Sequence, residues 1–347
     1  MYQFTEKFDT LLPRPGAGKR ILKSKLLTAL GATGVLLPYP DNTERLIERK
    51  ILLQNAFNTT GGSGGGPTPP PAICTTGTTV VADWVVRVGN NGGAAPSAAT
   101  QTALKDFVCG CVADGTWTKL KAVNVFVPDN LIACITPLLV GTGSDPWGNE
   151  GGNFVGGDLT VNGLTGNASN KTLTTTIHLS TFIPVNTGGF AWYCYNAANN
   201  GVSLGVYDEV KGMFGISAIG GTTQVANGNT NAQPPAGDLI VVNPNVGNGY
   251  FASVRTGATD NRVFFANSTN PHAQVGVTDT HSWTGPFSVF GTGFQIFALQ
   301  DTLGAEQLFS SDTISFVAFY QDFTATDSAN LYTRVQALRV TLGGGFR

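Results

Sequence analysis

The chain offers few residues that could do chemistry, and the most suggestive are two adjacent acids. Asp208 and Glu209 stand in the run GVYDEVKG. A glycoside hydrolase needs two carboxylates about 5–9 Å apart that face each other across the sugar. Adjacent residues on a strand point to opposite faces, so these two alone cannot form that pair. The run is predicted to be a charged hairpin turn, with Asp158 and Asp238 left as chance partners.

Histidines and basic loops indicate no metal site and no catalytic triad. Nothing in the spacing of His178, His272 and His281 brings them to a carboxylate or a cysteine, so they are predicted to be surface or core residues. The run PGAGKR, from Pro15 to Arg20, lacks the first glycine and the Ser or Thr of a phosphate-binding loop. It is predicted to be a flexible basic loop, and we expect no cofactor and no bound metal.

The cysteines form no familiar pattern. The chain has five of them, Cys74, Cys109, Cys111, Cys134 and Cys194. Cys109 and Cys111 form a C-x-C pair, which is shorter than the C-x-x-C of redox and zinc sites, and no second pair has metal-ligand spacing. The odd count and the spacing predict free, buried thiols in a chain made in a reducing compartment.

Aromatic residues give the better binding hypothesis. Sugar rings stack on exposed aromatic faces while Asn and Asp side chains bond the sugar hydroxyls. Trp192 and Tyr195 lie on one expected strand, Trp283 stands beside a Gly-Pro turn, and these three are the predicted glycan-binding residues. Because Trp192 and Tyr195 point to opposite faces, at least one of them is expected in the core. The alternative for each aromatic is packing in the core or between subunits.

The composition predicts that β-strands position these side chains. Only 12% of the 347 residues are charged, 45 are glycine and 41% are hydrophobic. From residue 147 onward, apolar runs alternate with Asn, Gly, Asp and Pro clusters about every ten to fifteen residues, which is typical of two stacked antiparallel sheets. The predicted fold class is mainly β: an antiparallel jelly-roll or concanavalin-like β-sandwich with a small helical insert and an extended N-terminal arm.

The N-terminal region is predicted to be a basic arm on a tether. Residues 1–58 carry nine basic and five acidic residues, a net charge of +4, and the remainder carries 11 basic and 17 acidic residues, a net charge of −6. Such an arm is expected to dock on an acidic surface, and charges this dilute favour a protein over nucleic acid. Residues 59–72, which include TTGGSGGGPTPPP, are expected to be a flexible and then stiff tether. The predicted anchoring residues are Lys19, Arg20, Lys23, Lys25, Arg45 and Arg49.

Residues 73–146 are predicted to hold a strand and a helical subregion that packs on the sandwich. The strand is expected from Thr78 to Asn91, where the sequence is rich in β-branched residues. Ser97 is the expected cap of a helix that carries Leu104, Phe107, Val108, Cys111 and Val112 on one face and ends at Asp114-Gly115. A second helical segment is expected over Trp117, Leu120 and Val123, and a third from Asp129 to Pro137.

Residues 147–347 are predicted to form the sandwich and a closing helix. Asp327 or Ser328 is the expected cap of that helix. Leu331, Val335 and Leu338 are expected on its apolar face.

Parts of this sequence resemble a known module. The run LKDFVCGCVADGTWTKLKAVNVFVPDNLIACITPLLVGTG, followed by GNFVGGDLTVNGLTGNASNKTLTTT, resembles a module found in many tailed-bacteriophage structural proteins. The ending SFVAFYQDFTATDSANLYTRVQAL is similar to the last strand and closing helix of that module. The resemblance covers residues 97–340 and implies a lectin-like sandwich in a fibre, a spike or another virion protein.

Composition and resemblance together predict a bacteriophage virion structural protein rather than an enzyme. The first hypothesis is a tail-associated fibre or adhesin that attaches to host-surface glycan. The second is a capsid decoration or head-fibre protein whose arm, residues 1–58, grips other virion proteins. A polysaccharide depolymerase is the third.

Assembly and location follow from the same features. A charge-poor sandwich with spare apolar faces commonly completes itself by symmetric assembly, so we expect a trimer or a multi-copy lattice position. No membrane span, signal peptide or direct nucleic-acid contact is expected. The chain is predicted to be made in the host bacterial cytoplasm and to reside in the virion.

Overall fold

The computed structural model describes residues 74–178, 186–198, 200–208, 212–219, 222–227, 240–242, 248–280, 293–300 and 305–344. The chain divides into two units, Met1–Ala72 and Ile73–Arg347. The predicted anchoring residues and the predicted tether lie outside the described residues. The described elements all belong to the second unit.

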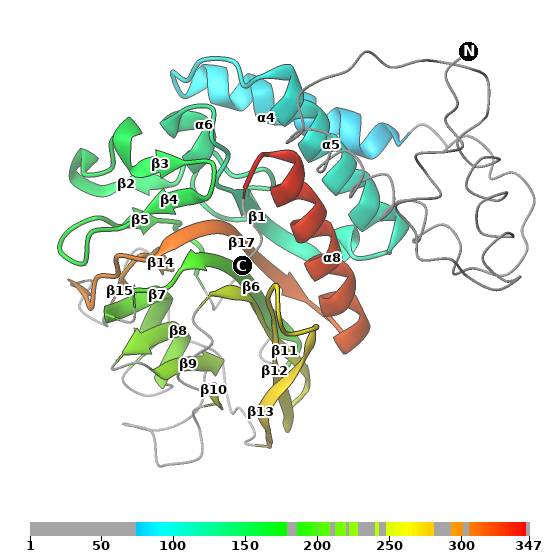
Figure 1. Cartoon of the computed structure of the whole chain (residues 1–347), viewed down its shortest axis with the longest axis vertical. Helices are drawn as coiled ribbons and strands as arrows, with labels where there is room; N and C mark the ends of the chain where they lie inside the picture. Colours follow the sequence, from blue (N-terminus) through cyan, green and yellow to red (C-terminus); the bar gives the residue numbers. More distant parts are fainter. Residues whose placement is uncertain are drawn as a thin grey trace, which may run out of the picture. The chain divides into compact units, whose positions relative to one another are not determined.

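One sheet of the second unit joins strands from distant parts of the chain. It has eight strands among the described residues, in the order β13-β12-β11-β6-β17-β4-β3, and β1 also pairs with β17 (Figure 1). Its strands are β1 (Leu120–Val125), β3 (Leu159–Thr160), β4 (Gly163–Thr165), β6 (Gly188–Asn196), β11 (Gly249–Gly257), β12 (Asp260–Ala266), β13 (Ala273–Asp279) and β17 (Thr313–Gln321). We call it sheet A.

The other sheet, sheet B, has nine strands among the described residues. Its order is β10-β9-β8-β7-β14-β5-β2, with β15 paired to β7 and to β16. Its strands are β2 (Gly148–Asn149), β5 (Leu173–Thr174), β7 (Asn200–Asp208), β8 (Gly212–Ile219), β9 (Thr222–Asn227), β10 (Ile240–Val242), β14 (Gln295–Ile296), β15 (Leu299–Gln300) and β16 (Glu306–Gln307). The pairing is antiparallel apart from the parallel contact of β15 with β7.

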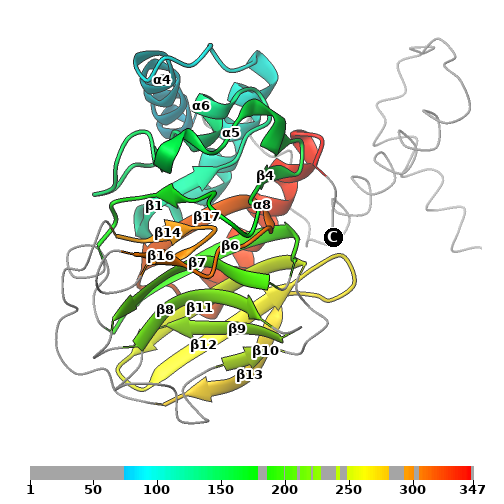
Figure 2. The same ribbon diagram turned by 90° about the vertical axis from the view of Figure 1, so that its left-hand side faces the viewer.

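The two sheets pack face to face and confirm the predicted fold class, a mainly β antiparallel sandwich. Buried side chains of sheet A, such as Trp192 and Phe251, form one core with Leu204 and Ile296 of sheet B. The strands of the two sheets run in similar directions (Figure 2), as in aligned sandwiches. Because side chains alternate along β6, Tyr193 points away from sheet B and belongs to a second core.

Helices cover the other face of sheet A (Figure 1) and close this second core. Phe107 of α5, for example, packs edge-on against Phe316 of β17 with ring centroids 5.9 Å apart. The helices are α4 (Thr75–Asn90), α5 (Ala98–Ala113), α6 (Leu131–Ile135) and α8 (Ala325–Thr341), with short 3-10 turns at Trp117–Lys119, Glu150–Gly152 and Gly156–Asp158. The central strands of sheet A, β6, β11 and β17, are therefore buried on both faces, between sheet B and the helices.

The predicted helix after Ser97 is confirmed as α5. The Ser97 hydroxyl accepts a hydrogen bond from the Thr100 N–H at 3.2 Å, and Asp114 follows the last helical residue. Four of the five residues predicted on its apolar face are buried, but Val112 is 40% exposed. At 100° per residue Val112 lies 80° from Leu104 around the helix, at the margin of the buried stripe.

The segment predicted as a strand from Thr78 to Asn91 is instead helix α4, so that prediction is wrong. Its buried residues are Gly77, Val81, Trp84 and Val88, which recur every three to four positions. The Trp84 indole N–H also donates to the Thr136 carbonyl at 2.9 Å. Burial of one face by tertiary packing outweighs the β preference of its valines.

The second predicted helical segment is also wrong. Only Trp117–Lys119 forms a 3-10 turn, and the chain then enters β1, which pairs with β17. Leu120 and Val123 face the helices, whereas Ala122 faces sheet B. A strand buried on both faces shows no alternation of polar and apolar residues, so the sequence carries no strand pattern at β1. The third segment is confirmed as α6, capped by Asn130 and followed by Pro137.

The closing helix is confirmed as α8, but its cap differs from the prediction. Thr324 is the N-cap: its hydroxyl accepts from the Asp327 N–H at 3.2 Å, and the Asp327 carboxylate accepts from the Thr324 N–H at 2.8 Å. This reciprocal pair is a capping box, so Asp327 stands three residues inside the helix. Leu331, Val335 and Leu338 are buried, as expected.

Two of the five cysteines contradict the prediction of free thiols. Cys74 and Cys109 form a disulfide between the start of α4 and the C-terminal half of α5. The other three, Cys111, Cys134 and Cys194, are free and buried as predicted. The pairing depends on how α4 crosses α5, which the spacing of the cysteines does not encode.

Candidate functional site

Trp192, the first predicted glycan-binding residue, lies in the core between the sheets. Its side chain is 1% exposed, and its ring stacks on Phe251 with centroids 4.5 Å apart and planes 24° apart. The faces of the indole are thus occupied by neighbouring side chains. Trp192 offers no surface on which a sugar could stack.

Tyr195 lies on the opposite face of β6, beside a buried arginine. The Arg339 guanidinium of α8 lies 3.9 Å from the Tyr193 ring centroid and 5.5 Å from that of Tyr195. Arg339 is 4% exposed and donates to the Ser315 hydroxyl, and burial lowers its pKa. Half-buried Tyr195 therefore holds α8 against sheet A. The third candidate, Trp283, lies outside the described residues.

The carboxylates considered for hydrolysis do not meet in the described part of the chain. Asp158 pairs with Lys171 and accepts from the Val155 N–H at 2.8 Å, so it holds the loops around β3 and β4. For Asp208 only the backbone position at the end of β7 is described, and Glu209 and Asp238 lie outside the described residues. Among the described residues, no group of three or more His, Cys, Asp or Glu side chains could hold a metal ion.

His272 serves packing, in line with the predicted surface or core role. Its Nε2 lies 2.9 Å from the Ser328 hydroxyl of α8, and its ring stacks on Phe264 at 5.1 Å and on Tyr332 at 5.9 Å. Burial lowers the pKa of His272 to about 4, so the imidazole is neutral near pH 7. His281 lies outside the described residues.

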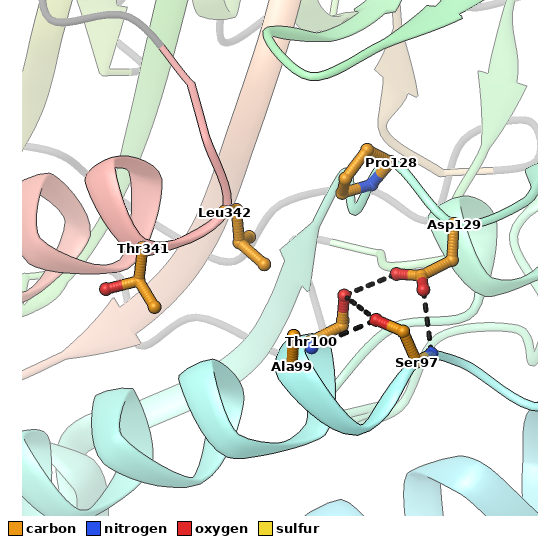
Figure 3. A pocket seen from close by; sticks show the side chains of 7 residues that line it. All are labelled: Ser97, Ala99, Thr100, Pro128, Asp129, Thr341 and Leu342. Atoms are coloured by element: carbon orange, nitrogen blue, oxygen red, sulfur yellow. Dashed lines mark hydrogen bonds between the residues drawn. The ribbon is translucent and has the colours of Figure 1, made fainter. Parts of the chain in front are cut away.

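A surface pocket of about 240 Å³ is the candidate binding site among the described residues (Figure 3). It lies where three elements meet: the start of α5, the loop after β1 and the end of α8. Its lining residues are Ser97, Ala99, Thr100, Pro128, Asp129, Thr341 and Leu342. Pro128 and Leu342 give it apolar walls, and Asp129 gives it a charge.

A hydrogen-bonded network fixes the polar wall of this pocket. One Asp129 oxygen accepts from the Ser97 N–H at 2.7 Å and the other from the Thr100 hydroxyl at 2.5 Å. The Ser97 hydroxyl donates in turn to the Thr100 hydroxyl at 3.0 Å. Asp129 therefore ties the loop after β1 to the first turn of α5, where a negative charge also complements the helix dipole.

This geometry suits a ligand group that donates hydrogen bonds. A carboxylate has about four acceptor positions, and the two bonds to Asp129 leave room for a hydroxyl or an amine. An anion is disfavoured, because Asp129 already occupies the N-terminal end of α5. The sequence placed Asp129 only at the start of a helical segment, and the Pro-Asp-Asn turn gave no sign of the contact with Ser97 and Thr100.

Comparisons with known proteins give a distant likeness of fold. The sequence matches no protein-family model and no curated protein. Domain 4 of AbnA, a GH43 extracellular arabinanase from Geobacillus stearothermophilus solved with arabinotriose, is 14% identical, with a TM-score of 0.34 over 62% of this chain and 98% of that domain. A Trypanosoma rangeli sialidase mutant that displays trans-sialidase activity is 12% identical, with a TM-score of 0.38 over 69% of this chain and 39% of the sialidase.

A third solved structure is SO2946, a protein of unknown function from Shewanella oneidensis MR-1. It is 11% identical, with a TM-score of 0.29 over 46% of this chain and 69% of that one. Likenesses this weak carry no statement about activity. Among the described residues, no helix is long and apolar enough to cross a membrane.

Proposed function

We propose that the chain is a bacteriophage virion structural protein, in which residues 1–58 bind other virion proteins and the sandwich is displayed from the particle. The proposal rests on the resemblance of residues 97–340 to a tailed-phage module and on the organisation of the chain. It assigns no catalysis to the sandwich. It also expects several copies to associate, most simply as a trimer.

The observation that carries this proposal is the division of the chain directly behind its Gly/Pro run. The boundary falls between Ala72 and Ile73, one residue after the last proline of that run. Net charge changes sign across it, from +4 for residues 1–72 to −6 for residues 73–347. A basic segment joined by such a run to a body with two cores of its own is the layout expected of an anchored display protein.

Two positions in the virion fit this layout. The first is a tail-associated fibre or adhesin that attaches to host glycan, and its sugar site would then use Trp283, the Asp129 pocket or loops outside the described residues. The second is a capsid decoration or head-fibre protein, which needs no sugar site. The burial of Trp192 and the packing of Tyr195 on Arg339 favour the second position. A polysaccharide depolymerase stays third.

Localisation on intact particles tests the proposal. An antibody raised against residues 73–347, with a gold label, would be imaged on purified particles. Label spread over the head supports decoration, and label at the tail or its tip supports the adhesin. Absence of the chain from particles that assemble and infect normally would refute a virion role.

Binding assays then separate the three activities. A decoration protein should bind capsids when residues 1–58 are present and lose that binding when the six predicted anchoring residues are changed to Gln. An adhesin should bind host envelope glycans through residues 73–347. A depolymerase should release reducing ends from host polysaccharide, and a steady release would contradict the structural role.

A further inference from the structure

The disulfide between Cys74 and Cys109 occupies a distinctive place in the chain. Cys74 is the second residue of the second unit, directly after the boundary behind the Gly/Pro run. It is also the N-cap of α4, a helix of 16 residues. Its partner lies 35 residues later in α5. The bond therefore ties the entry of the second unit to the helical layer.

The two bonded cysteines differ from the other three in their exposure. Cys74 and Cys109 are both half-buried, so each keeps part of its surface toward solvent. Cys111, Cys134 and Cys194 are fully buried, each with 0% of its surface exposed. Burial raises the pKa of Cys111 to about 12, and burial likewise raises the pKa of Cys134 and Cys194, so these thiols do not ionise near pH 7. Of the five cysteines, only this bonded pair has surface that faces solvent.

The position of Cys74 favours exchange at this pair. The Gly77 N–H of the first turn of α4 donates to the Cys74 sulfur at 3.4 Å. Free N–H groups and the positive end of the dipole at a helix N-terminus stabilise a thiolate. A disulfide opens more readily when the sulfur that leaves does so as a stabilised thiolate. Attack on the Cys109 sulfur, with Cys74 as the leaving group, is therefore the favoured direction of opening.

We propose that Cys74 and Cys109 form a reversible redox site, open to small thiols and disulfides, that clamps the first turn of α4 to α5. In opening, a thiolate of the reductant attacks Cys109, a mixed disulfide forms and Cys74 leaves as a thiolate. A second thiol of the reductant then displaces Cys109. The reductant loses two electrons and becomes a disulfide, and the two cysteines take up two protons. A small disulfide such as oxidised glutathione reverses each step.

The effect of opening is confined to the start of α4. The far half of this helix has its own anchors: Trp84 donates to the Thr136 carbonyl at 2.9 Å, and Arg87 donates to the Pro137 carbonyl at 2.8 Å and pairs with Asp145 at 3.1 Å. The first turn is held by the disulfide and by the close approach of Gly77 to α5. Reduction removes one of these two restraints, so it should loosen the first turn and leave the rest of the helix in place. This inference goes beyond the proposed virion role and does not depend on it.

Differential alkylation of the full chain tests the accessibility. Protein purified without reductant would be treated with iodoacetamide before and after mild reduction by reduced glutathione, under native conditions, and mapped by mass spectrometry. We expect no label before reduction and label on Cys74 and Cys109 alone after it. C111S should give the same pattern and is the matched control on the same helix. Label on the pair without reductant, or none on it after reduction, overturns the proposal.

Hydrogen exchange tests the clamp. In C74S/C109S the serine at position 74 keeps an N-cap oxygen, so the helix start is preserved while the bond is lost. We expect the amides of residues 77–80 to exchange at least about tenfold faster in this variant and in the reduced wild type, and those of residues 84–90 to be unchanged. C111S should match the wild type throughout. Equal exchange at residues 77–80 with and without the bond would refute the clamp.

Discussion

Replacing Trp192 with alanine tests whether this residue stabilises the core or binds sugar. Burial of a Trp side chain covers about 200 Å², which at about 25 cal/mol per Å² stabilises the fold by about 5 kcal/mol. Its indole nitrogen makes no hydrogen bond among the described residues, so the loss is one of packing alone. Core substitutions of this kind cost about 3–5 kcal/mol. We expect W192A to lower the free energy of unfolding by about that amount.

Guanidinium unfolding followed by circular dichroism measures this change. W192F is the matched control, because a phenyl ring keeps the stack on Phe251 and should cost about 1–2 kcal/mol. A loss of less than about 1 kcal/mol in W192A, together with weaker binding to host glycans, would contradict the assignment of Trp192 to the core.

Three further predictions concern the helical layer. D327A removes the side-chain acceptor of the α8 capping box and the pair with Lys119 at 2.7 Å, and should cost about 1–3 kcal/mol in the same unfolding assay, whereas a cost near zero would show that the cap is dispensable. The pKa of folded His272 is about 4 and its ordinary value is 6.5, so between these pH values only the unfolded state takes up the proton. The melting temperature should therefore fall as pH drops from 6.5 to 4. In H272F the part of this fall that is due to His272 should vanish. G77A places a methyl group 2.8 Å from the Lys105 carbonyl and should cost about 1–3 kcal/mol, whereas G89A, with open space around it, should be neutral or slightly stabilising; equal effects would refute the close crossing of α4 and α5.

Local signals in the sequence were enough where they agreed with one another. For α5, the Ser97 cap, the apolar spacing and the Asp114-Gly115 stop all pointed to one helix, and its bounds were predicted closely. The sandwich followed from short apolar runs between turn residues. In both cases the information lies within a few residues along the chain.

Features that depend on what packs against an element were not predictable. The valines of α4 favour a strand, and only the partners buried against Val81 and Trp84 select the helix. Alternation along β6 could show that Trp192 and Tyr195 face opposite ways, but not that sheet B covers one face and α8 the other. The Asp129 pocket and the Cys74–Cys109 bond likewise join segments that only the tertiary fold brings together.

The central strands of sheet A are covered on both faces, but the segments that cover and pair them are made at different times during synthesis. β17 and α8 come after every other described element in chain order, yet β17 lies between β6 and β1, and α8 helps to cover Tyr193 and Tyr250. Until they leave the ribosome, β6 has an unpaired edge and an uncovered aromatic face, a combination that promotes aggregation. Chains that end before Thr313 should therefore be insoluble. The order of the strands would thus make solubility depend on translation proceeding through α8.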